Sequence, residues 1–394
     1  MKILMINSVC GIGSTGRMCT DLAVALEKQG HQVKIAYGRK TVPRQFEQYA
    51  VRIGNDISLI THILKARWSD RCGFGSKRET REFIKWIKDY NPDVIHLHNL
   101  HGYYVNLELL FDYLRTCEKK IIWTLHDCWS FTGHCAHFDY VGCEKWKFKC
   151  ENCPQRTHYP KSYMVDCSKV NYKKKKELFT SISNLTIVTP SVWLANLVEK
   201  SYLAHNAIKV IRNGVDTSVF RPRVNNVREE YGLENKKIIL GVAAIWDKRK
   251  GLDSFIELSK MVSEDYRIVL VGVSRSQIKK LPANIVGIES VDSVERLAEL
   301  YTMADVFVNP TLEDTYPTTN LEAIACGTPV VTFDTGGSSE SARMYGKVVQ
   351  KNDIEGILNA VDNASEFEKN HIDVDYNKTV ARYLLLYNDI FDTN

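Results

Sequence analysis

Three acidic residues lie close together in the segment from Pro310 to Gly337, PTLEDTYPTTNLEAIACGTPVVTFDTGG. Glu313 and Asp314 precede a short polar stretch, and Glu322 follows it. The run before them, ADVFVN, is typical of a buried strand, LEAIAC favours a helix and GTPVVTF predicts the next strand. The acids therefore belong to a loop and helix at the carboxyl end of a strand, where open α/β sheets bind ligands.

The start of this helix could bind an anion. Backbone N–H groups at Thr318, Thr319 and Asn320 would lack partners within the helix, and the helix dipole there favours a group such as phosphate. Glu322 would lie about one turn further on. Its carboxylate could complement the helix dipole, or it could accept hydrogen bonds from sugar hydroxyls beside the phosphates. The local pattern leaves both readings open.

A glycine-rich loop follows the first strand. Gly11, Gly13 and Gly16 match G-x-G-x-x-G between a strand and a helix. We rank contact of a phosphate or sugar with Gly13 and Ser14 first, and a tight turn second. An NADP site ranks third, because Arg39 at the end of the second strand could meet the extra phosphate.

Five cysteines lie within CWSFTGHCAHFDYVGCEKWKFKCENC. Zinc needs about four soft ligands, and a terminal C-x-x-C is half of many such sites. We expect a structural zinc ion at Cys135, Cys143, Cys150 and Cys153. Cys128 is a spare or alternative ligand, and His134 and His137 are further candidates. The competing interpretation is a set of free cysteines that pack the loop.

The segment from Glu144 to Lys176 is strongly basic. It contains ten Lys or Arg against three Asp or Glu, a local charge of +7, whereas the whole chain carries +5. Aromatic residues are interspersed among the charges. This mixture suits an anionic membrane surface, a lipid-phosphate acceptor or a nucleic acid. An ordinary solvated surface is the alternative.

The composition of the 394 residues indicates a globular protein, with 44% hydrophobic and 25% charged residues. The opening MKILMIN has no leader pattern, and no apolar run is long enough to span a bilayer. The odd count of eleven cysteines favours reduced thiols or metal ligands over a disulfide framework. We therefore expect a cytoplasmic protein.

Two series of strand-like runs place these residues. The first is KILMIN, QVKIAYG, DVIHLH, KIIWTLH and LTIVTP, and the second is KIILGVAAI, RIVLVGV, ADVFVNP and PVVTF. Each series alternates with helical segments, which predicts an α/β fold with two Rossmann-like domains. We expect an N-terminal acceptor domain over 1–214 and a nucleotide-sugar-binding domain over 215–375. A helix over 376–394 would pack back on the first domain.

Seven segments together resemble retaining family 4 glycosyltransferases of the GT-B fold, especially the bacterial exopolysaccharide type that includes colanic-acid enzymes. They are GIGSTGR, HLHNLHG, TLHDCWSFTGHCAHFDY, VIRNGVDTSVFRP, WDKRKGLD, EDTYPTTNLEAIACGTPVV and TGGSSE. The resemblance runs from Gly11 to Glu340. It implies two domains that face each other across a cleft, with the sugar nucleotide held mainly by the second.

The resemblance assigns roles to the acids. It implies that Glu322 binds the donor ribose and that the backbone at 318–320 meets the diphosphate. Family members separate two acids by seven residues, as Asp314 and Glu322 are, although Glu313 aligns if the loop carries one insertion. Either acid contacts the transferred sugar.

The resemblance also implies an Arg and a Lys, six positions apart, that bind the departing diphosphate. Lys250 matches the Lys, but Ala244 stands at the Arg position. Lys248 or Arg249 is the expected substitute.

In the first domain, the resemblance implies that His126 makes a polar contact to the donor sugar or the reacting hydroxyl. Asp127 would orient His126 or an acceptor. Of the histidines in HLHNLH, we expect His96 in the core and His98 with Asn99 in the cleft.

The implied reaction retains the anomeric configuration and requires no cofactor. The expected partners are a nucleotide-diphosphate sugar donor, a glycan acceptor that we interpret as lipid-linked, and an anionic membrane surface, with no nucleic acid. Two alternatives stay open: an NADP-dependent oxidoreductase and a zinc-containing nucleic-acid-binding protein.

Overall fold

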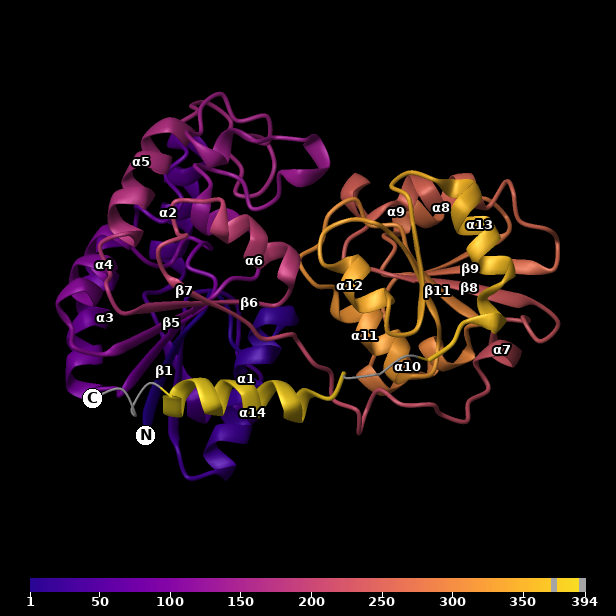
Figure 1. Ribbon diagram of the computed structural model, residues 1–394, viewed down its shortest axis with the longest axis horizontal. Coiled ribbons are helices and arrows are strands. Elements are labelled where there is room, and N and C mark those ends of the chain that lie inside the picture. Colours follow the sequence, from indigo (N-terminus) through magenta and orange to yellow (C-terminus); the bar gives the residue numbers. More distant parts are fainter. Residues whose placement is uncertain (370–373, 390–394) are drawn as a thin grey trace. The chain divides into compact units, whose positions relative to one another are not determined.

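Two parallel β-sheets organise the chain. The computed structural model describes residues 1–369 and 374–389, and it divides into two units (Figure 1). The boundary expected at residue 214 lies here between Ile211 and Arg212, and the chain from Val380 belongs to the first unit. Each unit is an α/β assembly in which helices accompany a sheet, as the alternating pattern predicts.

The first sheet has the strand order β3-β2-β1-β4-β5-β6-β7, and all neighbouring strands are parallel. Its strands are β1 (Lys2–Ile6), β2 (Gln32–Tyr37), β3 (Ala50–Arg52), β4 (Val94–Leu97), β5 (Lys120–Thr124), β6 (Leu185–Thr189) and β7 (Ala207–Val210). The central strands are buried almost throughout, since helices cover both faces of a sheet of this kind.

The helices of this unit connect its strands. They are α1 (Gly13–Lys28), α2 (Asp56–Ser69), α3 (Lys77–Tyr90), α4 (Leu107–Thr116), α5 (Ser168–Phe179) and α6 (Val192–Glu199). The unit also contains four 3₁₀ turns, which are η1 (Arg44–Tyr49), η2 (Trp129–Phe131), η3 (Asp139–Val141) and η4 (Lys145–Lys147). The last three interrupt one long connection between β5 and α5.

The second sheet has the order β10-β9-β8-β11-β12-β13 and is also parallel. Its strands are β8 (Lys237–Val242), β9 (Tyr266–Val271), β10 (Ile285–Ile288), β11 (Val306–Asn309), β12 (Val330–Phe333) and β13 (Gly346–Val349). Its helices are α7 (Val227–Glu230), η5 (Lys248–Lys250), α8 (Leu252–Leu258), α9 (Arg275–Ile278), α10 (Val294–Met303), α11 (Thr318–Ala325), α12 (Ser338–Ala342), α13 (Ile354–Asp362) and η6 (Ala364–Glu366).

The last helix, α14 (Tyr376–Asp389), packs on the first sheet (Figure 1). Its Tyr387 hydroxyl is 2.7 Å from His96 Nδ1, and its Tyr383 hydroxyl is 2.9 Å from Thr124 Oγ1. Both tyrosines are fully buried, whereas Leu385 is exposed. The two tyrosines therefore attach this helix to the first sheet. Residues 390–394, which the sequence predicts as the end of the same helix, lie outside the described part of the chain.

The structure contains no helix, within the residues it describes, that combines the length and apolar character needed to cross a membrane.

Candidate active site

Two loops of the second unit meet at the carboxyl ends of the adjacent strands β8 and β11. Lys250, after β8, donates from Nζ to Asp314 Oδ2, after β11, over 2.6 Å. Arg249 Nη1 donates to the backbone oxygen of Glu313 at 2.9 Å. The sequence therefore brings its basic cluster and its paired acids together, at the edge of the sheet where such folds bind ligands.

The local sequence explains why the basic loop turns here. The Asp247 side chain accepts a hydrogen bond from Lys250 N at 3.0 Å, which caps η5. Gly251 has φ +79°, and a Cβ at this position would lie 2.2 Å from the Pro310 oxygen. Only glycine lets the two loops approach this closely.

The two neighbouring acids have different surroundings. Glu313 is completely buried, whereas Asp314 is partly exposed and faces Lys250. Gly337 N donates to the Asp314 backbone oxygen at 2.9 Å, so the loop after β12 also supports this position. Asp314 is thus the acid that the fold presents beside a cation.

The position where the family carries an arginine is exposed. Ala244 lies there, just after β8, and Lys248 is exposed in the following turn. Of the two expected substitutes, Arg249 is bonded to the backbone of Glu313, whereas Lys248 makes no ion pair among the described residues.

Helix α11 begins beside these loops. Its first residues, Thr318 and Thr319, are partly exposed, and no side chain caps the helix at Pro317. The backbone N–H groups at this end remain suited to an anion. Asn320 differs, since its N–H donates to the Pro317 oxygen at 3.3 Å.

The Asn320 side chain is fully buried and has a structural role. Its oxygen accepts from Asn309 at 2.7 Å, and its nitrogen donates to Ser338 Oγ at 3.1 Å and Ser341 Oγ at 2.9 Å. These bonds tie α11 to β11 and α12. Asn320 therefore positions the helix start.

Glu322 lies in α11 and is 8% exposed. The buried Tyr301 hydroxyl of α10 donates to its Oε2 at 2.9 Å. This bond fixes the orientation of the carboxylate. The sequence does not predict the role of Tyr301, because nothing in the spacing of two residues on different helices indicates that they meet.

In the first unit, α1 begins at Gly13, and no side chain caps the helix at Ile12. Gly11 and Gly13 have φ values of +72° and +65°, so the loop uses the conformational freedom of glycine. Gly13 and Ser14 are exposed. The loop is therefore both a tight turn and an accessible backbone surface.

A pair of histidines lies at the ends of β4 and β5. His98 Nδ1 and His126 Nε2 are 3.0 Å apart, and burial lowers the pKa of His126 to about 4. His96 is in the core, as expected. His98 is also buried, at 1% exposure, and Asn99 is partly exposed; both line one pocket with His126 and Asp127.

Asp127 is held by a relay of polar groups. His101 Nε2 is 2.7 Å from Asp127 Oδ2, and His101 Nδ1 is 2.8 Å from the Tyr159 hydroxyl. Burial alone would raise the pKa of Asp127, but the charge and hydrogen bond of His101 lower the pKa to about 2. Asp127 is therefore a carboxylate with one fixed orientation.

The four cysteines expected to bind zinc line a separate pocket of the same unit, on the connection between β5 and α5.

Comparisons with known proteins agree with this architecture. The family described as Glycosyltransferase Family 4 matches residues 15–219, and the family described as Glycosyl transferases group 1 matches residues 236–366. WcaC of Escherichia coli, named as a glycosyl transferase of colanic acid biosynthesis, is 24% identical over 387 residues. The alignment covers 90% of this chain and 88% of WcaC.

Solved structures are similar over the whole chain. Sucrose-phosphate synthase from Thermosynechococcus elongatus has a TM-score of 0.70 at 15% identity, and the match covers 100% of both chains. HepE of Anabaena in complex with UDP has a TM-score of 0.63 at 14% identity, over 99% of this chain and 96% of HepE. These similarities confirm the expected GT-B fold.

Proposed function

We propose that this chain, which belongs to glycosyltransferase family 4, transfers a sugar from a nucleotide-diphosphate sugar to a glycan acceptor with retention of configuration. The observation that carries the proposal is the meeting of Lys250 with Asp314 beside the open start of α11. A cation, a carboxylate and free helix N–H groups at one sheet edge suit a sugar attached to a diphosphate. Because the chain belongs to this family, we prefer this proposal to the NADP-dependent oxidoreductase and the nucleic-acid-binding protein.

In the proposed donor site, Glu322 accepts hydrogen bonds from the ribose, and the N–H groups of Thr318 and Thr319 bind the diphosphate. Asp314, not Glu313, accepts hydrogen bonds from the transferred sugar, because Glu313 is completely buried. HepE was solved with UDP and with UDP-glucose, which supports a donor of this class.

The proposed chemistry needs positioning and charge stabilisation. The bond between the anomeric carbon and the diphosphate breaks, and the acceptor oxygen bonds to that carbon from the same face. A phosphate oxygen of the leaving group takes the acceptor proton. Lys250 stabilises the negative charge that develops on the diphosphate. No protein nucleophile and no cofactor take part.

The first unit is proposed to receive the acceptor. His126 and Asp127 both follow β5, and the relay through His101 fixes the Asp127 carboxylate. A fixed carboxylate can accept a hydrogen bond from an acceptor hydroxyl and orient it. The similarity to WcaC supports a glycan of polysaccharide biosynthesis as the acceptor.

A lipid-linked acceptor would bring the first unit to a membrane, and α2 has a suitable surface. Ile57, Ile60, Leu64 and Trp68 are 77%, 56%, 61% and 68% exposed. At 3.6 residues per turn they fall within about 80° of the helix circumference. We call these four residues the α2 stripe.

Basic residues and a neighbouring segment of the chain lie beside the α2 stripe. Lys65 and Arg67 flank it and are exposed, without an ion-pair partner among the described residues. Tyr163 N donates to the Arg67 oxygen at 2.8 Å, which places the exposed Tyr163 and Met164 next to the end of α2. An apolar face with basic flanks is the surface that an anionic bilayer binds.

The basic segment from 144 to 176 offers less free positive charge to a membrane than its composition predicts. Lys175 is buried under Trp129, with its Nζ donating to the Trp129 oxygen at 2.5 Å. Lys149 and Lys169 both pair with Glu151. The proposed membrane surface is therefore centred on the α2 stripe.

A donor screen tests the proposed function. The purified chain is incubated with UDP- and GDP-sugars and a lipid-diphosphate glycan, and thermal unfolding is followed with UDP, GDP, NADPH or single-stranded RNA. We expect transfer from one donor class and protection by its nucleoside diphosphate alone. Protection by NADPH or RNA, with no transfer from any donor, would contradict the proposal.

A further inference from the structure

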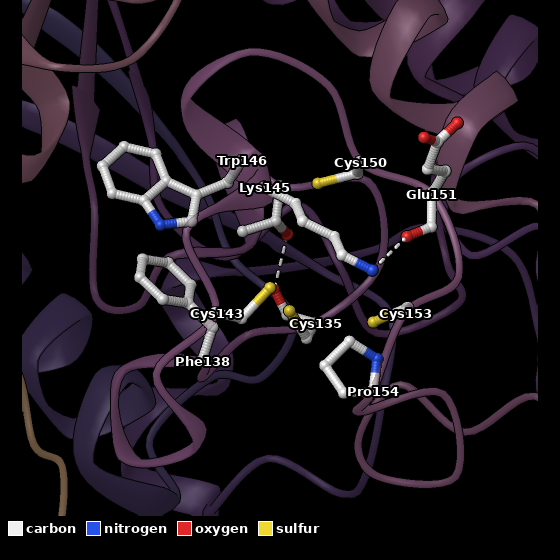
Figure 2. Close-up of a pocket in the computed structure, with 10 residues that line it drawn as sticks. Cys135, Phe138, Cys143, Lys145, Trp146, Cys150, Glu151, Cys153 and Pro154 are labelled. Carbon is white, nitrogen blue, oxygen red and sulfur yellow. Dashed lines mark hydrogen bonds between the residues drawn. The ribbon is translucent and has the colours of Figure 1, made fainter.

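We propose that Cys135, Cys143, Cys150 and Cys153 bind one structural zinc ion. The four residues line a single pocket on the connection between β5 and α5, and their sulfur atoms point into it (Figure 2). They are spaced C-x7-C-x6-C-x2-C, and all are free thiols. Four thiolates are a complete tetrahedral set for structural zinc.

The connection gives these residues a common location. Residues 125–167 contain no helix longer than a 3₁₀ turn, and Cys135, Cys143 and Cys150 each follow one of the turns η2, η3 and η4. Cys135 and Cys150 are buried in the same pocket that Cys143 and Cys153 line. Residues far apart along an irregular segment thus converge, although no secondary structure requires it.

The surroundings suit a metal thiolate centre. Phe138 and Trp146 form an apolar wall of the pocket, with ring centroids 5.0 Å apart. Lys145 lines it as well, and its ammonium is fixed by the backbone oxygens of Glu151 at 3.0 Å and Asn152 at 3.2 Å (Figure 2). A zinc ion with four thiolates carries a net charge of −2, which a nearby ammonium partly offsets.

Binding requires the thiols to close on the ion. Across residues 1–369 and 374–389, no three His, Cys, Asp or Glu side chains already stand in positions that could hold a metal. Because the four cysteines line one pocket, the proposal requires side-chain rotations and small shifts of the turns that bring the sulfurs to a common centre. In this proposal, zinc holds the four cysteine side chains in fixed positions.

The zinc ion would support the candidate active site. The same connection carries Tyr159, whose hydroxyl is 2.8 Å from His101, which in turn binds Asp127. The backbone bonds inside this segment mostly close single turns, so a metal crosslink between the turns would restrict its motion further. The ion has no role in the chemical step.

The first test is metal content. The full chain, produced in zinc-supplemented medium and purified without chelator, should contain about one zinc per chain by elemental analysis. Exchange for Co²⁺ should give the charge-transfer absorption of thiolate-bound cobalt. Neither measurement depends on activity, so the result is independent of the proposed function. A metal-free chain, or an intramolecular disulfide between two of these cysteines, would overturn the inference.

Variants locate the site. Cys150→Ser together with Cys153→Ser should remove the zinc and increase amide exchange in residues 125–167. Cys117→Ser, which changes a partly buried cysteine outside the pocket, should retain the metal. If the double variant does not fold, the cobalt spectrum of the unmodified chain still decides. Retention of zinc by a folded double variant would contradict this ligand set.

Discussion

The Lys250 ammonium and the Asp314 carboxylate lie 2.6 Å apart and join the loops that follow β8 and β11. The pair is partly exposed, with 24% and 17% of the two side chains accessible, so neither charge is committed to the core. A donor that enters here would meet a cation and a carboxylate whose positions each loop already fixes. This preorganisation is what charge stabilisation in a transition state requires.

Lys250→Ala is expected to slow sugar transfer by about 100-fold or more, because one charge contact to the leaving diphosphate is lost. The effect should appear in kcat, with little change in donor KM. Initial rates at saturating donor provide the measurement. Lys260→Ala, an exposed lysine of the same unit, is the control. Unchanged kcat in Lys250→Ala would remove this residue from the site.

Glu322→Gln is expected chiefly to raise the KM for the donor. The amide retains an acceptor for Tyr301 but weakens the hydrogen bonds proposed for the ribose. Glu322→Ala is a less specific test of donor binding, because it also affects the stability of the protein. It leaves the buried Tyr301 hydroxyl without this partner, which costs about 1–3 kcal/mol of stability.

Tyr301→Phe separates the two effects of Glu322. It keeps the carboxylate and removes the bond that orients it, so we expect a smaller rise in donor KM than in Glu322→Gln. Calorimetric titration with the nucleoside diphosphate checks both variants. Wild-type affinity in both would contradict the assignment of Glu322 to the donor.

His101→Ala is expected to lower the rate of transfer to the acceptor by roughly 10- to 100-fold, because Asp127 loses the group that orients it. Donor affinity should stay the same, since Glu322 and Lys250 are in the other unit. His101→Gln keeps one hydrogen bond and should recover part of the rate. An equal loss in donor affinity would indicate a general structural defect instead.

The strong apolar runs of the sequence predict most of the fold. Nine expected strands correspond to β1, β2, β4, β5, β6, β8, β9, β11 and β12. The sequence does not predict β3, β7, β10 and β13, which have three or four residues each and weaker apolar patterns. β7 is partly exposed at the end of its sheet, so burial does not mark it in the sequence.

The candidate site is predictable only where its residues are neighbours along the chain. The acid pair and the basic cluster are each local, and strand order brings them together. The contact of His101 with Tyr159 spans 58 residues, and it depends on how an irregular segment folds. No periodicity or spacing encodes such a contact.

Replacing Leu64 and Trp68 of the α2 stripe by Glu is expected to abolish binding to anionic liposomes, because charge would replace apolar surface at the membrane. Co-sedimentation should show that wild-type binding requires anionic lipid and weakens as salt rises. Val224→Glu, a fully exposed apolar residue outside the stripe, is the control. Equal binding to neutral liposomes, or none to anionic ones, would contradict the proposed surface.

His96 is expected to make the first unit less stable in acid. Burial, together with the nearby charge of His126, lowers its pKa to about 3, whereas an unfolded chain has a histidine pKa near 6.5. Between these values the unfolded chain binds the additional proton, so the free energy of unfolding falls as pH decreases. The loss from this residue is about 2 kcal/mol between pH 7 and pH 5.

Urea unfolding of the first unit at pH 7, 6 and 5 measures this dependence. His96→Gln should be less stable than the wild type at pH 7, because the bonds to Tyr387 and Thr124 are weakened, but it should lose less stability on acidification. The exposed His205→Gln should keep the wild-type dependence. A His96→Gln curve parallel to the wild type would show that this buried imidazole does not carry the acid sensitivity.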